Sequence, residues 1–242
     1  MFGLFGKKKL LTSGLLEGMT DIHCHLLPAV DDGAGNEEEA LQALELMESI
    51  GVQRLFFTPH VMEDLAHNQA DFLCECFERF RSKLTTPIEL RLAAEYMLDP
   101  AFAARKKEGL LTFDGKHVLV ETSYLMPPLG FHEILFELQA EGYQPILAHP
   151  ERYRYMSPDD YDWLFEHEMA LQLNVMSLAG TYGPSPQRRA EDLLAKNYYT
   201  FIGSDCHRRE VYERSLQHLK VSTTQFETLK LLLENNKRLA LP

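Results

Sequence analysis

Apolar positions along the chain follow two alternating spacings, one typical of buried strands and the other typical of amphipathic helices. Short apolar runs predict strands that begin at Thr20 and then cover Val52–Phe57, Ile88–Ala94, Val118–Val120, Pro145–Ala148, Leu171–Val175 and Tyr199–Gly203. Between these runs, apolar residues recur every three or four positions and predict helices at 36–51, 69–84, 100–108 and 131–141, and after Ser157, Ser185 and Thr224. Seven strand–helix units in one chain favour a parallel α/β sheet.

Residues with capping preferences mark the ends of several predicted helices. Asn36, with a glutamate three positions later, indicates a helix start, and Gly51 indicates the end of the same helix. Thr224, also followed by a glutamate three positions later, predicts the start of the last helix. The dipeptides Ser157-Pro158 and Ser185-Pro186 each place a proline near the first helical position, which proline favours.

Residues that commonly bind metal ions recur at the C-terminal ends of the predicted strands. His23 and His25 are two positions apart on a strand, so their side chains point to the same side. Any one of these residues taken alone could be a solvated side chain at a strand end, but together they predict a multinuclear metal cluster. The candidate ligands are His23, His25, Asp32, His60, Glu95, Glu121, His149, Asp205 and His207. In a barrel of parallel strands such ends converge on one face, so we expect a closed, somewhat irregular TIM-like barrel rather than an open sheet.

The types of ligand indicate which metals and which chemistry to expect. Imidazoles and carboxylates without a thiolate suit manganese, iron or zinc better than calcium. Two or three divalent metal ions held close together bind a phosphate between them and lower the pKa of a bridging water, which can then attack at neutral pH. We expect Glu95 to bridge two of the metals and Glu121 to be a second carboxylate ligand.

Three arginines lie close in sequence to the candidate ligands. Arg152 follows His149 by three positions, and Arg208 and Arg209 directly follow His207. A guanidinium beside the metals would bind the outer phosphate oxygens and neutralise the charge that develops on the phosphoryl group. The alternative for each arginine is a surface salt bridge.

Composition narrows the class of protein. The chain has 242 residues, of which 45% are hydrophobic, so it can bury a large core. Its formal net charge of −12 argues against a nucleic-acid partner, since phosphate contacts need a basic face. Four cysteines without a CxxC pair or a secreted spacing predict a reduced, cytoplasmic protein.

The apolar runs and the N-terminal segment bear on contact with a membrane. No apolar run reaches the length of a membrane span. The start of the chain, MFGLFGKKK, places a few apolar residues before three lysines, the reverse of a signal peptide. For residues 1–9 we therefore expect either an unstructured terminus or a weak contact with a membrane surface or a partner.

The motifs together resemble those of the polymerase-and-histidinol-phosphatase (PHP) superfamily. Their VDDG and AHPERY elements are similar, more narrowly, to those of the manganese-dependent protein tyrosine phosphatases of bacterial capsule and exopolysaccharide synthesis. The resemblance covers residues 19–235, so we expect an N-terminal extension at 1–18 and a phosphatase barrel domain at 19–242. It rests on the segments Asp21–His25, Val30–Gly33, Thr58–His60, Ala94–Glu95, Val120–Glu121, Ala148–Tyr153 and Gly203–His207.

The resemblance implies a distorted (β/α)7 barrel, the PHP fold, with a trinuclear metal site whose metals are most often manganese. It implies three ligand groups: His23, His25, Glu95 and Asp205; Glu95, Glu121 and His149; and Asp32, His60 and His207. It places the family's phosphate-binding arginine on Arg152. A second arginine of the family has no unambiguous match, because Arg208 and Arg209 lie closer to His207 than the family's usual pattern.

The function that this resemblance implies is hydrolysis of phosphotyrosine in a protein, plausibly the tyrosine-rich C-terminal tail of a capsule-associated tyrosine kinase. The attacking species would be a metal-bridging hydroxide, without a covalent enzyme intermediate. A cysteine-based phosphatase needs Cys-x5-Arg, and the residues six after the four cysteines are Val30, Phe80, Ser82 and Tyr212.

Three other functions are compatible with parts of the sequence. The nearest is a PHP phosphoesterase for a small metabolite, like a histidinol phosphatase, or for a nucleotide. An amidohydrolase barrel also begins with His-x-His, but it would need a metal-bridging lysine where this chain has Glu121. A non-catalytic metal-binding module would typically have lost ligands, and here all nine are present.

Overall fold

The central strands of the structure are parallel and lie in two sheets. The computed structural model describes residues 6–239. One sheet has six strands in the order β10-β9-β8-β7-β6-β4, and the other has three in the order β2-β3-β5. The strands are β2 (Met19–Asp21), β3 (Val52–Phe57), β4 (His60–Val61), β5 (Glu89–Leu92), β6 (Glu95–Met97), β7 (His117–Glu121), β8 (Gln144–Ala148), β9 (Ala170–Asn174) and β10 (Phe201–Gly203).

The two sheets are joined along both of their edges. At one edge, β3 and β5 are followed directly by β4 and β6, which are paired in the other sheet. At the other edge, the segments after β2 and β10 pair through a parallel bridge between Cys24 and Cys206. There the backbone N–H of His25 donates to the Cys206 carbonyl at 2.9 Å, and that of Asp205 donates to the His23 carbonyl at 2.8 Å. The seven strand segments therefore form the distorted (β/α)7 arrangement that the sequence predicts.

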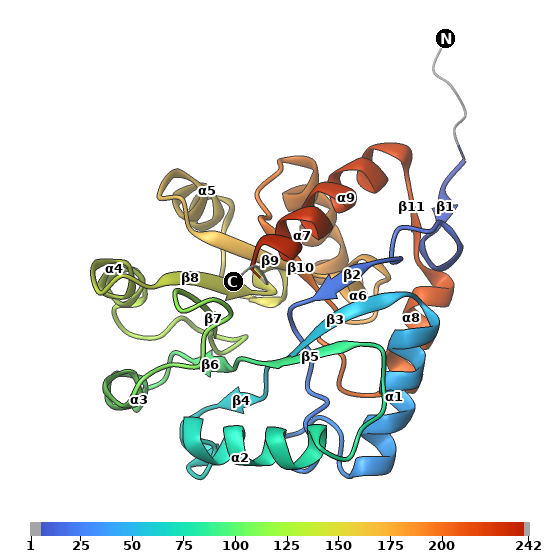
Figure 1. The fold of residues 1–242 in the computed structure, drawn as a ribbon. Coiled ribbons are helices and arrows are strands. Elements are labelled where there is room, and N and C mark those ends of the chain that lie inside the picture. Colours follow the sequence, from blue (N-terminus) through green and yellow to red (C-terminus); the bar gives the residue numbers. More distant parts are fainter. Residues whose placement is uncertain (1–5, 240–242) are drawn as a thin grey trace.

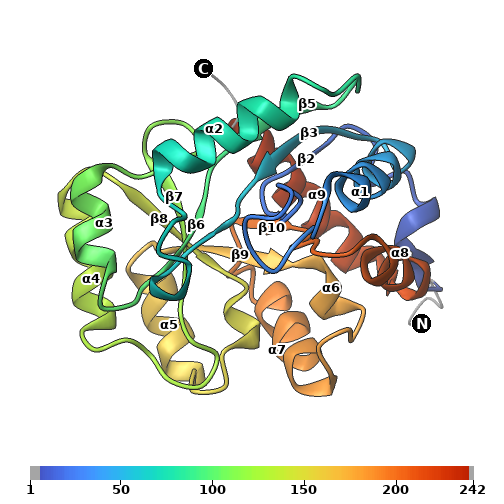
Figure 2. The ribbon, with the colours of Figure 1, turned by 90° about the horizontal axis from the view of Figure 1, so that it is seen from below.

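Helices cover the outside of this ring of strands, as Figures 1 and 2 show. They are α1 (Glu37–Ser49), α2 (Ala70–Arg81), α3 (Phe102–Glu108), α4 (Phe131–Ala140), α5 (Pro158–Glu166), α6 (Val175–Leu178), α7 (Pro184–Ala195), α8 (Arg209–His218) and α9 (Thr223–Arg238). Single 3-10 turns lie at Leu10–Thr12, Glu63–Leu65 and Pro150–Arg152. The larger apolar core lies between strands and helices.

A second, smaller apolar cluster takes one or two residues from almost every strand. It contains Phe56 of β3, Leu119 of β7, Ile146 of β8 and Phe201 of β10, all of them buried. Such alternate residues of parallel strands fill the inside of a barrel as layers. Because this layer is solid, the polar strand ends beyond it form the base of a site rather than the entrance of a channel.

The predicted helix boundaries are confirmed in part. Asn36 caps α1 by accepting from the Glu39 backbone N–H, and Ser157 forms a capping box at the start of α5. Two predicted starts are wrong. Helix α7 begins at Pro184 after Gly183, whose φ of 96° suits glycine, and α9 begins at Thr223 with Ser222 as its cap. In both cases the residue that caps the helix lies two positions before the predicted one.

The N-terminal segment is attached to the end of the fold. Strand β1 (Lys8–Lys9) pairs antiparallel with β11 (Lys220–Val221), so the expectation of an unstructured terminus is wrong for these two lysines. The expected membrane or partner contact falls largely on residues 1–5, which lie outside the described residues. The division between an extension at 1–18 and a domain from 19 stays a prediction. None of the helices in residues 6–239 is long and apolar enough to cross a membrane.

Candidate metal centre

All nine predicted ligands lie in one cluster at the C-terminal ends of the strands. They form four overlapping groups in which every ligand atom lies within 4.8 Å of the others. The groups are His23, His25 and Glu95; His23, His149 and Asp205; His60, Glu95 and Glu121; and His25, Asp32, His60 and His207. The strand ends bring them together because six separate strand segments finish on the same side of the ring.

The innermost part of the cluster joins the two sheets. The Nε2 atoms of His23 and His25 are 3.1 Å apart. Each lies 3.3 Å from Glu95 Oε2 and 3.4 Å from Asp205 Oδ1. Four ligands at about 2.1 Å from a tetrahedral metal ion would lie about 3.4 Å from one another. The spacing of these four atoms therefore fits a bound cation.

Glu95 is placed at the centre of the cluster and faces imidazoles with both carboxylate oxygens. Its Oε1 lies 3.0 Å from His149 Nε2, and its Oε2 lies 3.1 Å from His60 Nδ1. The same His60 nitrogen lies 2.8 Å from Glu121 Oε1. The resemblance implied a group of Glu95, Glu121 and His149, whereas the structure brings Glu121 next to His60.

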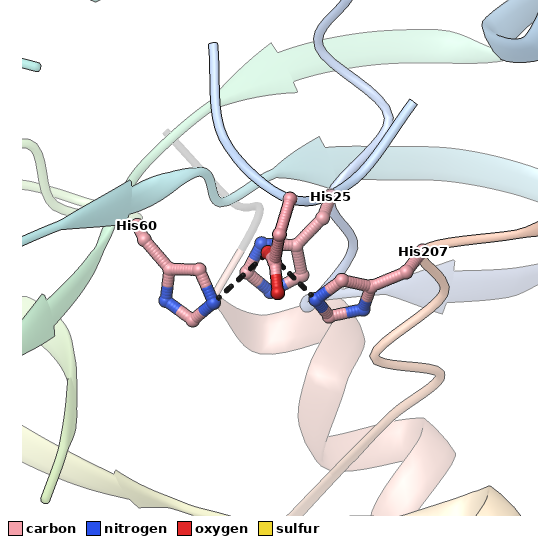
Figure 3. Close-up of side chains that lie close together, drawn as sticks. His25, His60 and His207 are labelled. Atoms are coloured by element: carbon pink, nitrogen blue, oxygen red, sulfur yellow. Dashed lines mark ion pairs between the residues drawn. The ribbon is translucent and has the colours of Figure 1, made fainter. Parts of the chain in front are cut away.

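The outermost part of the cluster opens to solvent. His60 and His207 approach from two sides in front of His25, as Figure 3 shows. Their Nε2 atoms lie 3.5 Å and 3.2 Å from Asp32 Oδ1. The His207 ring stacks on that of His25 with centroids 4.0 Å apart. The side chain of Asp32 is 71% exposed, so this side of the cluster is where a substrate can enter.

The electrostatics of the cluster indicate that it needs added positive charge. Within the described residues, both oxygens of Glu95 and Oε1 of Glu121 are buried and have no hydrogen-bond partner. Burial and the nearby His25 lower the pKa of His60, but the carboxylates of Glu95 and Glu121 outweigh them and raise it to about 10. Burial alone would raise the pKa of Glu95, and the imidazoles of His23 and His60 hold it well below its usual value. Against the effect of burial, nearby carboxylates also raise the pKa of His23 and His25, so without a cation they favour protonated imidazoles at His23, His25 and His60, and divalent metal ions would replace those protons.

Two candidate ligands have a left-handed backbone, which is rare for residues other than glycine. The φ angles are 36° at His149 and 51° at Asp205. The His149 N–H donates to the Gln172 carbonyl at 2.9 Å, and the Asp205 N–H donates to the His23 carbonyl. The surrounding strands therefore hold both residues in an unfavourable conformation, as is common at functional sites.

Three polar residues that the sequence reasoning did not select hold the ligands from behind. Asp31 Oδ2 lies 2.8 Å from His25 Nδ1, and Gln172 Oε1 lies 2.9 Å from His23 Nδ1. Asn174 Nδ2 donates to Asp205 Oδ2 at 2.7 Å. Such outer partners fix the orientation of metal ligands. The sequence signal for Gln172 and Asn174 was a pair of amides within an otherwise apolar strand.

One of the three candidate arginines contacts the side chain of a candidate ligand. Arg152 donates to Asp205 Oδ2 at 2.7 Å, and its guanidinium lies between the rings of Tyr124 and Tyr182, 4.5 Å and 4.1 Å from their centroids. Burial lowers the pKa of Arg152, but the Asp205 carboxylate and other nearby groups raise it by more, so the guanidinium stays charged.

The other two arginines are placed differently. Arg208 donates to the backbone carbonyls of Asp32 and Gly33, which fixes the loop that carries Asp32. Arg209 lies 3.7 Å from a carboxylate oxygen of Glu45 and 3.8 Å from one of Glu213. Of the three, only Arg152 is positioned by the structure next to the carboxylates of the cluster.

The chain is similar to known proteins of one family. A family model described as capsular polysaccharide synthesis, CpsB/CapC, matches residues 19–239. Tyrosine-protein phosphatase YwqE of Bacillus subtilis is 30% identical over 200 residues, covering 78% of this chain and 77% of that protein. CapC of Staphylococcus aureus is 27% identical over 234 residues and covers 90% of each chain.

A solved structure is also similar to this chain. It is one of the crystal structures of YwqE from Bacillus subtilis and CpsB from Streptococcus pneumoniae, which are described as unique metal-dependent tyrosine phosphatases. The TM-score is 0.74 at 26% sequence identity, and the match covers 90% of this chain and 95% of that one.

Proposed function

This chain belongs to the CpsB/CapC family of capsular polysaccharide synthesis, and from this membership we propose that it is a metal-dependent phosphatase acting on phosphotyrosine in proteins. The observation that carries the proposal is the cluster of imidazoles and carboxylates at the strand ends, which has the composition and spacing of a metal centre. The relatives bear the name tyrosine-protein phosphatase, and the similar solved structure is described as metal-dependent. They favour this function over hydrolysis of a small metabolite phosphate or a nucleotide.

The nine-residue cluster is proposed to hold two or three divalent metal ions, most readily manganese, with iron or zinc as alternatives. His23, His25, Glu95 and Asp205 would hold the innermost ion. Divalent cations in such a site bind phosphate oxygens and lower the pKa of a water. The buried oxygens of Glu95 and Glu121 support this assignment, because they face imidazole nitrogens without forming a hydrogen bond within residues 6–239, as expected of ligands that would share a metal ion with those imidazoles. The number and the identity of the metal ions are part of the proposal.

The residues of the chain have separate tasks in this proposal. Arg152 would bind an outer phosphoryl oxygen, since its guanidinium is charged and lies beside Asp205 at the edge of the cluster. Tyr124 and Tyr182 hold that guanidinium between their rings. Arg208 would position the Asp32 loop, and Arg209, paired with Glu45 and Glu213, stays a weaker candidate for phosphate contact.

A cysteine nucleophile does not fit this site. Cys24 and Cys206 lie next to the ligands in sequence but are fully buried. Burial raises the pKa of both thiols, which disfavours the reactive thiolate. All four cysteines are free, which supports the proposed cytoplasmic location.

The proposed substrate is the C-terminal tail of a bacterial tyrosine kinase.

The test compares three phosphate esters on chelator-treated enzyme before and after manganese is restored. A phosphotyrosine peptide is assayed beside a phosphoserine peptide and histidinol phosphate. We expect activity only with metal, a preference for phosphotyrosine, and loss of at least about a hundredfold in His149→Ala, because one ligand of the cluster is removed. The matched control is His218→Ala, which removes an exposed imidazole of α8.

The outcomes separate the candidate functions. Preferential hydrolysis of histidinol phosphate would overturn the protein substrate and keep the metal chemistry. Full activity of the chelated enzyme, or of His149→Ala with unchanged metal content, would overturn the metal centre.

A further inference from the structure

The loop between β7 and α4 exposes an unusual number of large apolar side chains. Leu125 and Met126 are 68% and 66% exposed, and Leu129 is fully exposed. Pro127 and Pro128 lie between them. Scattered apolar residues on a surface are ordinary, but several together indicate a binding surface. We call residues 124–129 the apolar loop.

The apolar loop begins beside the candidate metal centre. It follows Glu121, a candidate ligand at the end of β7, by three positions. The Tyr124 ring lies 5.9 Å from that of His149, and the Arg152 guanidinium lies 4.5 Å above it. The Tyr124 carbonyl accepts a hydrogen bond of 2.8 Å from the Arg154 N–H. The apolar surface is therefore continuous with the place where the phosphate would bind.

A groove of about 600 Å³ lies along the apolar loop. Its walls include Met97 of β6, Phe102 of α3 and Ile134 of α4, together with Met126 and Leu129. Leu98, which also lines the groove, donates its backbone N–H to the Glu121 carbonyl at 2.9 Å, so this wall lies beside the metal centre.

The charged groups at the groove are already paired with neighbours. Lys106 pairs with Glu141 at 2.6 Å and with Glu137 at 3.7 Å. Asp99 pairs with Arg105 at 2.9 Å. The groove thus offers an occupant apolar contacts rather than an ion pair, which indicates that the occupant is itself apolar.

From these observations we propose that the apolar loop and its groove bind apolar side chains that flank the phosphotyrosine of the protein substrate. The inference rests on the proposed function and adds a substrate preference to it. The loop's six residues span at most about 20 Å, so the flanking side chains lie within about six residues of the phosphotyrosine. The two prolines restrict the free loop, which reduces the entropy lost on binding.

The test measures KM and kcat for three substrates with manganese-loaded enzyme. Two phosphotyrosine peptides of equal length carry either leucines or serines on both sides of the phosphotyrosine, and 4-nitrophenyl phosphate reports the chemistry without flanks. We expect the wild-type enzyme to have a KM about tenfold lower for the leucine peptide. The double variant Met126→Ser/Leu129→Ser should lose this difference, with kcat on 4-nitrophenyl phosphate unchanged. The control Leu231→Ser removes a leucine that is 65% exposed on α9 and should retain the difference.

Each outcome decides between the two proposals. Equal KM values for the two peptides, or a preference that survives in the double variant, would overturn this inference alone. Absence of activity on all three substrates would overturn the proposed function as well. A concentration-dependent dimer in analytical ultracentrifugation that the double variant abolishes would assign the apolar loop to a second copy of the chain and overturn its role in substrate binding.

Discussion

Two adjacent aspartates take opposite positions at the metal centre. Asp32 extends into solvent opposite His60 and His207. The side chain of Asp31 is buried, and its carboxylate accepts from the backbone N–H groups of Gly33 and His60 while it lies against His25 Nδ1. Burial alone would raise the pKa of Asp31, but His25 holds it below its usual value. Asp31 therefore stays charged and orients a candidate ligand without belonging to the ligand set.

The variant Asp31→Asn tests this positioning role. The amide keeps the shape but loses the charge, so His25 is held less firmly. We expect manganese affinity, measured by titration of chelator-treated protein, to fall by about 10- to 100-fold, with the fold retained by circular dichroism. The control Asp64→Asn neutralises an exposed aspartate of the Glu63–Leu65 turn. Unchanged affinity in Asp31→Asn would contradict the role.

At the scale of elements, the start of α9 shows how capping patterns compete. Thr224 with Glu227 fits the sequence signature of a capping box, but so does Ser222 with Gln225, two positions earlier. In the structure Ser222 Oγ accepts from the Gln225 N–H at 3.2 Å, and Gln225 Oε1 accepts from the Ser222 N–H at 2.9 Å. The earlier pair wins because Val221 before it is held in β11 beside β1.

Replacing each of the two competing residues measures their separate contributions. Ser222→Ala should lower the free energy of unfolding by about 1 kcal/mol, because it removes the cap. Thr224→Ala, at an exposed position inside the helix, should change it by less than about 0.5 kcal/mol. Urea denaturation of both variants gives these values. A larger loss in Thr224→Ala would show that α9 begins later than described.

At the scale of the whole molecule, one buried side chain of α9 spans the junction between the two sheets. Asn236 Nδ2 donates to the carbonyls of Thr20 at 2.8 Å and Ile202 at 2.6 Å, and its Oδ1 accepts from the Ile202 N–H at 3.2 Å. Thr20 belongs to β2 and Ile202 to β10. The amide thus satisfies backbone groups of β2 and β10. These two short strands meet where the ring is least regular.

Asn236→Ala is therefore expected to be strongly destabilising. Buried backbone groups that lose a partner cost about 1–3 kcal/mol each, so the free energy of unfolding should fall by at least about 2 kcal/mol. The neighbouring control Asn235→Ala removes one half-buried hydrogen bond to the Thr200 carbonyl and should cost about 1 kcal/mol. Thermal and urea unfolding of both variants check the difference. Equal losses would mean that Asn236 does not join the sheets.

The sequence determined the order of strands and helices and the identity of the candidate ligands. Apolar spacing is a local property, and it marks strands and helices even where their partners are unknown. The placement of histidines and carboxylates at strand ends is also local, and a parallel barrel brings those ends together by its topology. The Arg152 position could be selected in the same way because it lies three residues after His149.

Only the tertiary structure decided which side chains meet. The pairing of His60 with Glu121, the contact of Asp31 with the His60 backbone, the contacts of Gln172 and Asn174 behind the ligands, and the different surroundings of Arg152 and Arg208 join residues 29 to 176 positions apart. The same holds for the apolar loop, since its exposure beside the metal centre depends on how β7 and α4 pack. Local preferences fix the conformation of a segment, whereas contacts between distant segments depend on the register and packing of the whole ring, which no short stretch of sequence contains.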